Sequence, residues 1–329
     1  MTDGADAPLP DEPAPDAVLL AGLTASGKTD WALALAERWP IEIVSVDSAQ
    51  VYRGFDVGAA KPSAALQARV PHHLLDIRDP TETYSAGEFA ADAVRAIEAI
   101  RGRGRLPLLV GGTMLYFRAL VQGLAILPPA EPQRRREIDA RAARLGWPAL
   151  HAELMQRDPQ AAQRIHPHDA QRIQRALEVL ESSGRPISEW QRGTAPAHNL
   201  TLQRWALVPA DRAALVQRIE ARFQAMLADG FFEEVQRLHL RGDLSTATPA
   251  LRAVGYRQLW PCVAAGADRD TAIGQAIAAT RQLARRQLTW IRADPGWRTV
   301  DPLQPGAREN WITAVLAALR QRGPQSRGP

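Results

Sequence analysis

Residues 22–29 read GLTASGKT and have the Gly-x-x-x-x-Gly-Lys-Thr spacing of a phosphate-binding loop. Apolar residues 17–20 precede this stretch and a helical pattern follows it, which is the strand–turn–helix context that such a site needs. The amides of 24–29 and the helix N-terminus would hold phosphate oxygens, with a full charge from Lys28 and a hydroxyl for Mg²⁺ from Thr29. A chance match without a ligand is the alternative. The predicted phosphate contacts are Gly22, Thr24, Ala25, Ser26, Gly27, Lys28 and Thr29.

A lone carboxylate follows the second apolar run of the chain. An ATP-hydrolysing protein of this class would end a later strand in an acidic metal ligand, but the run at 106–112 continues as GGTMLY without one. Asp47 instead follows residues 41–46 directly, beside Ser48 and Gln50, at the edge where open α/β sheets bind ligands. We predict that Asp47 is a general base. An outer-sphere partner of Mg²⁺ or the cap of a turn would also explain it.

The GGTMLY segment predicts a second wall of the same site. Gly111 and Gly112 permit close approach of the backbone, and Thr113 stands where the next helix begins. A plain helix cap explains Thr113 equally well.

These residues need an α/β sheet to bring them together. Short apolar runs at 17–22, 41–46, 73–77 and 106–112 alternate with helical patterns, which predicts a parallel sheet with crossover helices. In one of these helices Ser85 and Glu88 have the spacing of a capping box. We therefore predict an α/β fold with a P-loop NTPase-like parallel sheet core.

The pattern changes after residue 112. Residues 127–132 break the chain, and from there to about 190 we find helical patterns without convincing strands. Residues 202–209 resemble a returning strand and 271–292 a long helix, and 296–301 could add a last strand. The sheet core is thus interrupted by an all-helical insertion. The predicted parts are a disordered tail at 1–16, core at 17–124, insertion at 125–200, mostly helical core at 201–322 and a disordered tail at 323–329.

Composition excludes several classes of protein. Cys262 is the only cysteine, which excludes an internal disulfide and a cysteine-rich zinc site and fits the cytoplasm. The N-terminal residues lack the features of a secretion signal, and no apolar run reaches the length of a membrane span. The net charge of +4 is small, so an anionic partner must be met by local basic clusters.

Arginines recur at helical spacing in three stretches. Arg172 and Arg175 share one predicted helix, and Arg218 and Arg222 share another. A third group, interleaved with aromatic residues, suggests a surface that follows a phosphate backbone and stacks on bases. Solvated helix faces are the simpler explanation of each stretch alone. The third group comprises Arg252, Tyr256, Arg257, Arg281, Arg285, Arg286, Trp290 and Arg292.

Residues 17–320 resemble the bacterial tRNA dimethylallyltransferases, because several motifs occur in the order typical of that family. The resemblance implies transfer of a dimethylallyl group from dimethylallyl diphosphate to the exocyclic amine of the adenine just 3′ of the anticodon, in tRNAs that read codons beginning with U. It also implies that the loop at 22–29 holds a diphosphate leaving group. The motifs are GLTASGKT, SVDSAQVYRGFDVGAAKP, HHLLDIRDPTETYSAGEF, LLVGGTMLYFRAL, RIHPHDAQRIQRALEV, RIEARFQAML and LRAVGYRQLW with ATRQLARRQLTW.

The resemblance assigns roles to individual residues. It implies that Asp47 is the general base, that Thr113 contacts the target adenine and that Arg222 faces the diphosphate, with Mg²⁺ on Thr29. We expect a monomer that binds the tRNA anticodon stem-loop through its insertion. We expect no membrane association. The implied tRNA contacts are Asp47, Ser48, Ala49, Gln50, Thr113, Arg135, Gln171, Arg172, Ile173, Gln174, Arg175, Arg252, Ala253, Val254, Gly255, Tyr256, Arg257, Arg285, Arg286, Gln287, Trp290 and Arg292.

Two rival functions remain at the level of sequence. A small-molecule P-loop kinase would use the insertion as a lid over ATP and need no RNA. A non-catalytic RNA-binding protein or RNA chaperone would bind tRNA and consume no allyl donor.

Overall fold

A computed structural model describes residues 14–125, 127–192 and 194–320. These residues belong to two compact units, which are Met1–Val121 with His198–Pro329, and Gln122–Ala197. The predicted tails fall outside the described residues except for 14–16. Asp16, which we predicted within the N-terminal tail, donates its amide to the Thr201 carbonyl and accepts from the Thr201 amide, so this residue belongs to the ordered core.

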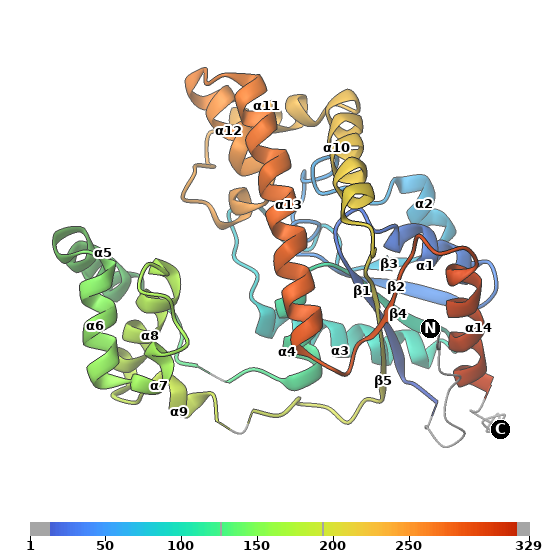
Figure 1. The fold of residues 1–329 in the computed structure, drawn as a ribbon, viewed down its shortest axis with the longest axis horizontal. Coiled ribbons are helices and arrows are strands. Elements are labelled where there is room, and N and C mark those ends of the chain that lie inside the picture. Colours follow the sequence, from blue (N-terminus) through green and yellow to red (C-terminus); the bar gives the residue numbers. More distant parts are fainter. Residues whose placement is uncertain (1–13, 126, 193, 321–329) are drawn as a thin grey trace. The chain divides into compact units, whose positions relative to one another are not determined.

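The first unit is built on a single six-stranded parallel sheet with the strand order β3-β2-β4-β1-β5-β6 (Figure 1). Because all strands run the same way, their carboxyl ends meet at one edge. β1 lies in the middle, paired with β4 on one side and β5 on the other. The strands are β1 Ala17–Gly22, β2 Ile41–Val46, β3 His72–His73, β4 Leu106–Gly111, β5 Leu202–Leu207 and β6 Arg298–Val300.

The third strand is much shorter than the sequence predicts. β3 contains only two residues, whereas the apolar run indicated a strand over 73–77. Leu74 and Asp76 both have positive φ angles, and the Asp76 amide donates to the Gln50 carbonyl instead of a neighbouring strand. Tertiary hydrogen bonds therefore override the local β propensity of this run.

Helices cover both faces of the sheet, which explains why β1 is apolar at every position. Val18 and Leu20 pack with Trp31 and Trp311 on one face, beneath α1 and α14. Leu19 and Ala21 belong to the core on the other face. The helices of this unit are α1 Lys28–Ala36, α2 Ala64–Arg69, α3 Ala86–Gly102, α4 Met114–Gln122, α10 Arg212–Ala228, α11 Phe231–Leu240, α12 Tyr256–Ala265, α13 Arg269–Ala293 and α14 Ala307–Arg320, with a 3-10 turn at Pro249–Arg252.

Helix caps follow the signals in the sequence. Ser85 and Glu88 form the predicted capping box at the start of α3. Asp211 accepts from two amides at the start of α10. No helix among residues 14–125, 127–192 and 194–320 is long and apolar enough to cross a membrane.

The regular elements in the described part of the second unit are all helices, and the unit has its own apolar core. Ile138, Leu150, Leu154, Ile173 and Leu177 form the centre of that core. The elements are α5 Pro132–Leu145, α6 Trp147–Arg157, α7 Pro159–Ala162, α8 Ala170–Ser183 and α9 Ile187–Trp190.

A buried carboxylate ties two helices of the second unit together. Glu178 on α8 is fully buried, and it accepts hydrogen bonds from the guanidinium groups of Arg135 and Arg175 and from the Glu131 amide. A buried acid with this many donors is held ionised, so its loss would leave two arginines without their partner.

We predict that Glu178→Ala lowers the free energy of unfolding of the second unit by about 3 kcal/mol, because a buried charged network loses its centre. Urea unfolding of the whole chain, followed by circular dichroism, measures the loss. Glu137→Ala is the matched control, since Glu137 is exposed on α5 and its sole hydrogen bond within the described residues is accepted from Gln133. Equal midpoints for the two variants would contradict the assignment.

Candidate active site

The loop after β1 has the shape that its sequence predicts. Gly27 has a φ of 91° and Ala25 a φ of 61°, so the chain turns sharply before α1 begins at Lys28. A Cβ at Gly22 would lie 2.8 Å from the Leu207 carbonyl oxygen, which leaves room only for glycine. Steric constraints therefore explain why positions 22 and 27 of the motif are glycine.

The Lys28 ammonium is held by its own loop. Nζ donates to the carbonyls of Gly22 at 3.0 Å and Leu23 at 2.8 Å. An ammonium has three protons, so these bonds leave one for an anion. Burial, together with the nearby positive charge of Arg222, lowers the pKa of Lys28 to about 7. A bound anion would reverse that shift, because an opposite charge favours the protonated form.

Two of the predicted phosphate-binding amides do not point toward a ligand. The Thr24 amide donates to Oε1 of Gln287, and the Ser26 amide donates to the Leu23 carbonyl. Prediction of a cradle from all amides of 24–29 was therefore too broad. Over the part of the chain that the structure describes, the amides of Ala25, Gly27, Lys28 and Thr29 have no acceptor.

The hydroxyls of the loop differ in their surroundings. Ser26 is buried and its Oγ has no hydrogen-bond partner among the described residues, as expected of a group that a ligand completes. Thr29 is exposed at the first turn of α1, where a hydroxyl can reach a metal ion beside a phosphate.

Asp47 directly follows β2 and interacts electrostatically with Lys28 of the loop after β1. Its Oδ1 accepts from the amide of Ala49 at 2.8 Å and that of Gln50 at 3.4 Å, so it also caps a turn. Its Oδ2 forms no hydrogen bond with any residue of the described ranges. Burial raises the pKa of Asp47, while the positive charges of Lys28 and Arg222 oppose that rise. One oxygen is thus fixed and the other is available to take a proton.

Thr113 joins the loops that follow β2 and β4. Its Oγ1 accepts from the Ser48 amide at 3.0 Å, and its own amide donates to the Val46 carbonyl. A Cβ on Gly111 would overlap the Val46 carbonyl, so the two loops approach only because this residue is glycine. The structure thereby brings Asp47, Ser48 and Thr113 together.

Helix α10 adds two cations to the loop. Arg222 interacts electrostatically with Asp47, and no ion pair or hydrogen bond engages it within the described part of the chain. It also lines a cavity of about 520 Å³ with residues of the 56–67 segment and of α10. Arg218 places a guanidinium nitrogen 3.4 Å from where a Cβ on Gly27 would lie. We did not assign Arg218 to the site, although its four-residue spacing from Arg222 was the available signal.

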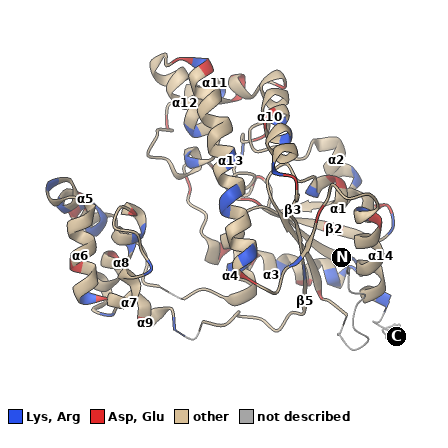
Figure 2. Ribbon diagram, viewed as in Figure 1, with Lys and Arg blue, Asp and Glu red and all other residues tan. Residues whose placement is uncertain are grey.

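The arginines of the third basic group lie on the 3-10 turn at Pro249–Arg252, on α12 and on α13. Arg252, Arg257, Arg285, Arg286 and Arg292 are exposed. Figure 2 shows basic residues along the C-terminal half of α13. Arg281 differs, because it pairs with Glu220 of α10.

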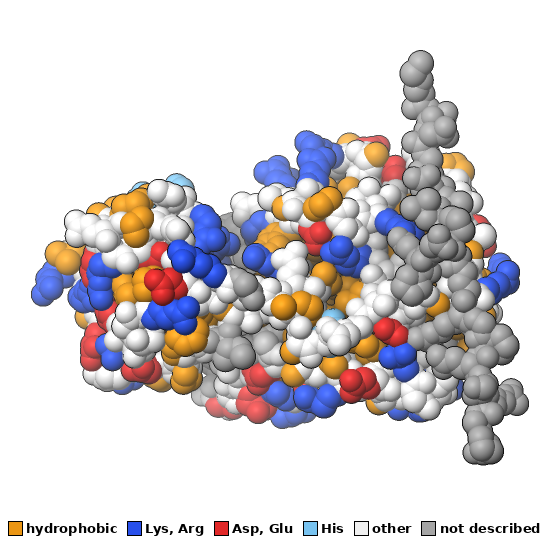
Figure 3. Space-filling view, turned by 90° about the horizontal axis from the view of Figure 1, so that it is seen from below, with side chains coloured by type: hydrophobic (Ala, Val, Ile, Leu, Met, Phe, Trp, Pro, Cys, Tyr) orange, Lys and Arg blue, Asp and Glu red, His pale blue; other side chains and the backbone are white. Residues whose placement is uncertain are grey.

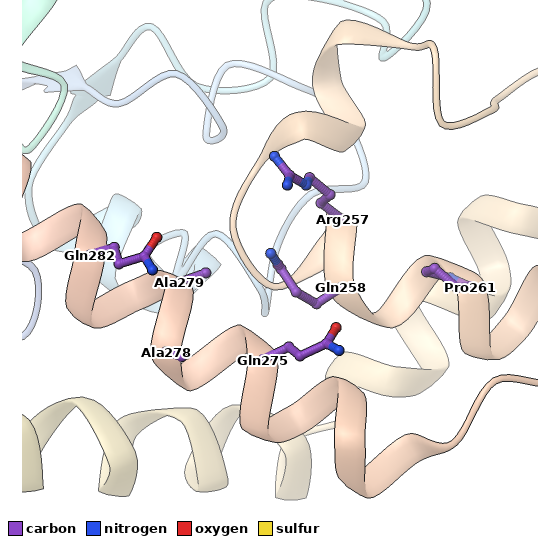
Figure 4. A pocket seen from close by; sticks show the side chains of 7 residues that line it. All are labelled: Arg257, Gln258, Pro261, Gln275, Ala278, Ala279 and Gln282. Atoms are coloured by element: carbon purple, nitrogen blue, oxygen red, sulfur yellow. The ribbon is translucent and has the colours of Figure 1, made fainter. Parts of the chain in front are cut away.

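Polar side chains accompany Arg257 between α12 and α13. Arg257, Gln258 and Pro261 of α12 face Gln275, Ala278, Ala279 and Gln282 of α13 across a shallow cavity of about 360 Å³ (Figure 4). Trp290 is half-buried, with the Arg118 guanidinium 5.7 Å from its ring centre. Arg118 is a further residue near α13 that we did not predict.

Several predicted RNA contacts have buried side chains, and these predictions need correction. Tyr256 is fully buried and donates its hydroxyl to Glu234, so it cannot stack on a base. Gly255 is buried against Phe231. Gln287 is 5% exposed and contacts the loop after β1. Ala253 and Val254 are half-buried in the same turn. An RNA contact by the remaining exposed residues of this segment stays a prediction, because the sequence could not show which side chains face inward.

In the second unit, some of the predicted RNA contacts are exposed and others are buried. Gln171 and Arg172 are exposed at the start of α8, whereas Ile173 belongs to the apolar core. Gln174 donates to Asp139. Arg135 and Arg175 are bound to Glu178, so their first role is structural. The space-filling view shows basic side chains on the visible surface of this unit and of the first (Figure 3).

Comparisons with known proteins identify what the chain resembles. The model of the IPP transferase family matches residues 50–294. A tRNA dimethylallyltransferase of Bordetella petrii is 58% identical over 92% of this chain and 97% of its own length, and one of Ralstonia nicotianae is 58% identical over 93% and 97%. The crystal structure of a full-length tRNA isopentenylpyrophosphate transferase from Bacillus halodurans is 33% identical with a TM-score of 0.66, covering 92% of this chain and 96% of that one.

We predict that inorganic pyrophosphate binding at pH 8 is coupled to proton uptake by Lys28, whose pKa of about 7 rises when an anion neutralises its surroundings. Calorimetry in buffers of different ionisation enthalpy measures the protons taken up. Lys28→Met is the control that removes the titrating group and retains a side chain of similar length. The same proton count for both proteins would place the titration elsewhere.

Proposed function

Since this chain belongs to the IPP transferase family and transfers a dimethylallyl group to tRNA, we propose that the two ends of its site divide the reaction between them. The loop after β1 binds dimethylallyl diphosphate, and Asp47 deprotonates the exocyclic amine of the adenine just 3′ of the anticodon. The observation that carries the proposal is that Asp47 lies within electrostatic reach of Lys28 and Arg222 while its Oδ2 remains available.

The proposed reaction is a substitution at the first carbon of the allyl group. The bond from that carbon to the diphosphate oxygen breaks, the bond to the adenine nitrogen forms, and a proton passes from the amine to Asp47. An adenine amine is a poor nucleophile because its lone pair is delocalised into the ring. Removing its proton as the new bond forms raises its reactivity, and general base catalysis of this kind contributes about 10²–10⁴-fold.

The opposite end of the site stabilises the leaving group. Charge grows on the diphosphate as the allyl carbon departs, and preorganised donors aimed at developing charge supply a large share of catalysis. In this proposal, two cations and four backbone amides stabilise that charge. The cations are the Lys28 ammonium and the Arg222 guanidinium, and the amides are those of Ala25, Gly27, Lys28 and Thr29. Arg218, beside Gly27, joins them as a further cation.

Mg²⁺ fits the donors of this site. No cluster of three or more His, Cys, Asp or Glu side chains that could hold a metal occurs in the described ranges. Mg²⁺ usually keeps several waters and binds through one or two protein ligands plus substrate phosphates, so Thr29 beside a diphosphate is a sufficient protein contribution. When bound, the ion would neutralise charge on the leaving diphosphate.

RNA binding would use the exposed basic residues and not every residue of the predicted segments. A base in a loop must leave its stack to reach an enclosed carboxylate, which costs a few kcal/mol that backbone contacts must offset. Arg172 in the second unit and the exposed arginines of α12 and α13 are available for phosphates. We propose that the second unit holds the anticodon stem. One chain supplies both ends of the site, so a monomer is sufficient for the proposed reaction. We propose that this monomer acts in the cytoplasm.

The test of this function incubates the purified protein with Mg²⁺, dimethylallyl diphosphate and unmodified tRNA that reads codons beginning with U. We expect the mass of one prenyl group on the target adenine. Replacing the allyl donor by ATP should give no phosphorylated product. Transfer of phosphate from ATP would support a kinase, and tRNA binding without any mass gain would support a non-catalytic RNA-binding protein.

We predict that Asp47→Asn lowers kcat by at least about 10²-fold, because an amide cannot accept the amine proton while it can still cap the turn at Ala49. The Kd for tRNA should stay within a few-fold of wild type. Single-turnover transfer and filter binding measure the two quantities. Wild-type turnover in this variant would remove Asp47 from the mechanism.

We predict that Arg286→Ala and Arg257→Ala weaken tRNA binding and each reduce the salt dependence of log Kd by about one unit of slope, as expected for a lost phosphate contact. Affinity measured from low to moderate salt gives the slope. Arg38→Ala is the control, since Arg38 follows α1 and pairs with Glu309 of α14. Unchanged slopes would show that these arginines of α12 and α13 are only solvated.

A further inference from the structure

One buried glutamine connects the two ends of the proposed site. Gln287 lies on α13 and is 5% exposed. Its Oε1 accepts from the Thr24 amide at 2.8 Å, and its Nε2 donates to the Gly112 carbonyl at 2.9 Å. A single planar amide group therefore spans two loops that lie almost ninety residues apart in the sequence.

Each bonded loop carries a different part of the reaction. Thr24 belongs to the loop that holds Lys28, and Gly112 directly precedes Thr113. Thr113 in turn accepts from the Ser48 amide, next to Asp47. These hydrogen bonds and the peptide bond from Gly112 to Thr113 thus connect the diphosphate end of the site to Ser48, the residue next to the proposed general base.

Only glutamine satisfies both loops at this position. Thr24 needs an acceptor and Gly112 needs a donor, and a neutral amide supplies both at once. Glutamate lacks the donor and would add a negative charge beside the phosphate loop, while asparagine is one methylene shorter. Gly112 has the complementary constraint, because a Cβ there would overlap Nε2 of Gln287.

We propose that Gln287 is a positioning residue that fixes the separation between the diphosphate-binding loop and the loops carrying Asp47 and Thr113. This inference rests on the function proposed above and replaces the RNA contact that the sequence predicted for this residue. By accepting from the Thr24 amide, Gln287 also removes this amide from the proposed phosphate cradle. Arg285 and Arg286 on the same helix are exposed, so neighbouring residues of α13 have different roles: Gln287 positions the loops, and the two arginines are available to RNA.

The test is Gln287→Met, which keeps the length of the side chain and removes both hydrogen bonds. We expect the KM for dimethylallyl diphosphate to rise about tenfold or more, because two hydrogen bonds that fix the loop are lost. The Kd for tRNA and its salt slope should stay within twofold of wild type. Gln236→Met is the matched control, since Gln236 is exposed on α11 and no hydrogen bond joins it to either loop among the described residues, and it should leave all three values unchanged.

A double-mutant cycle tests the geometry independently of how well Gln287→Met folds. Gly112→Ala places a methyl group against Nε2, so it should raise the KM for the allyl donor by about tenfold or more in the wild-type background. In a Gln287→Ala background the same substitution should cost at most about twofold, since the obstructing atoms are gone. Equal costs in the two backgrounds would overturn the inference.

The possible outcomes separate this inference from the proposed function. A wild-type protein that fails to transfer the allyl group would refute the function itself. A wild-type protein that transfers it, alongside a Gln287→Met variant with an unchanged KM for the allyl donor, would refute only the role of Gln287. A variant that loses tRNA affinity and salt slope with normal donor binding would restore the RNA contact and overturn the positioning role.

Discussion

The site depends on keeping two opposite charges close without letting them pair. Lys28 is held by the carbonyls of Gly22 and Leu23, and Asp47 is held by the amide of Ala49. No direct ion pair joins them in the part of the chain that the structure describes. In a direct ion pair the Lys28 ammonium would donate its free proton to an Asp47 oxygen, and neither group would then be available to substrate. Backbone groups thus fix each charge, so the ammonium can meet a diphosphate and the carboxylate can take a proton.

The parallel sheet and its glycines make this arrangement possible. The loops after β1, β2 and β4 meet at one edge because their strands run the same way. They approach closely because Gly22 and Gly111 lack side chains, and Gln287 enters where Gly112 leaves space. Each glycine has a specific neighbour that a methyl group would meet. These are steric requirements of the site, and they matter as much as its charged groups.

Much of the charge in this protein is structural. Glu178 engages Arg135 and Arg175 inside the second unit, and Glu234 accepts from the amides of the 56–58 segment and from Tyr256 inside the first. Arginines that the sequence grouped together therefore divide into two classes. Those bound to buried acids hold helices in place, whereas exposed ones such as Arg172 and Arg286 can meet RNA phosphates.

The sequence alone determined the parallel α/β core, the capping box of α3, the loop at 22–29 and the carboxylate after β2, because these follow from local periodicity and spacing. It could not determine the length of β3 or the burial of Tyr256, Ile173 and Gln287. Those depend on which face of a helix or turn packs inward and on hydrogen bonds to distant segments. Only the tertiary structure showed that Arg218 lies beside Gly27 and that the Thr24 amide donates to Gln287. Residues this far apart in the sequence come into contact through the packing of whole elements, which residue spacing does not predict.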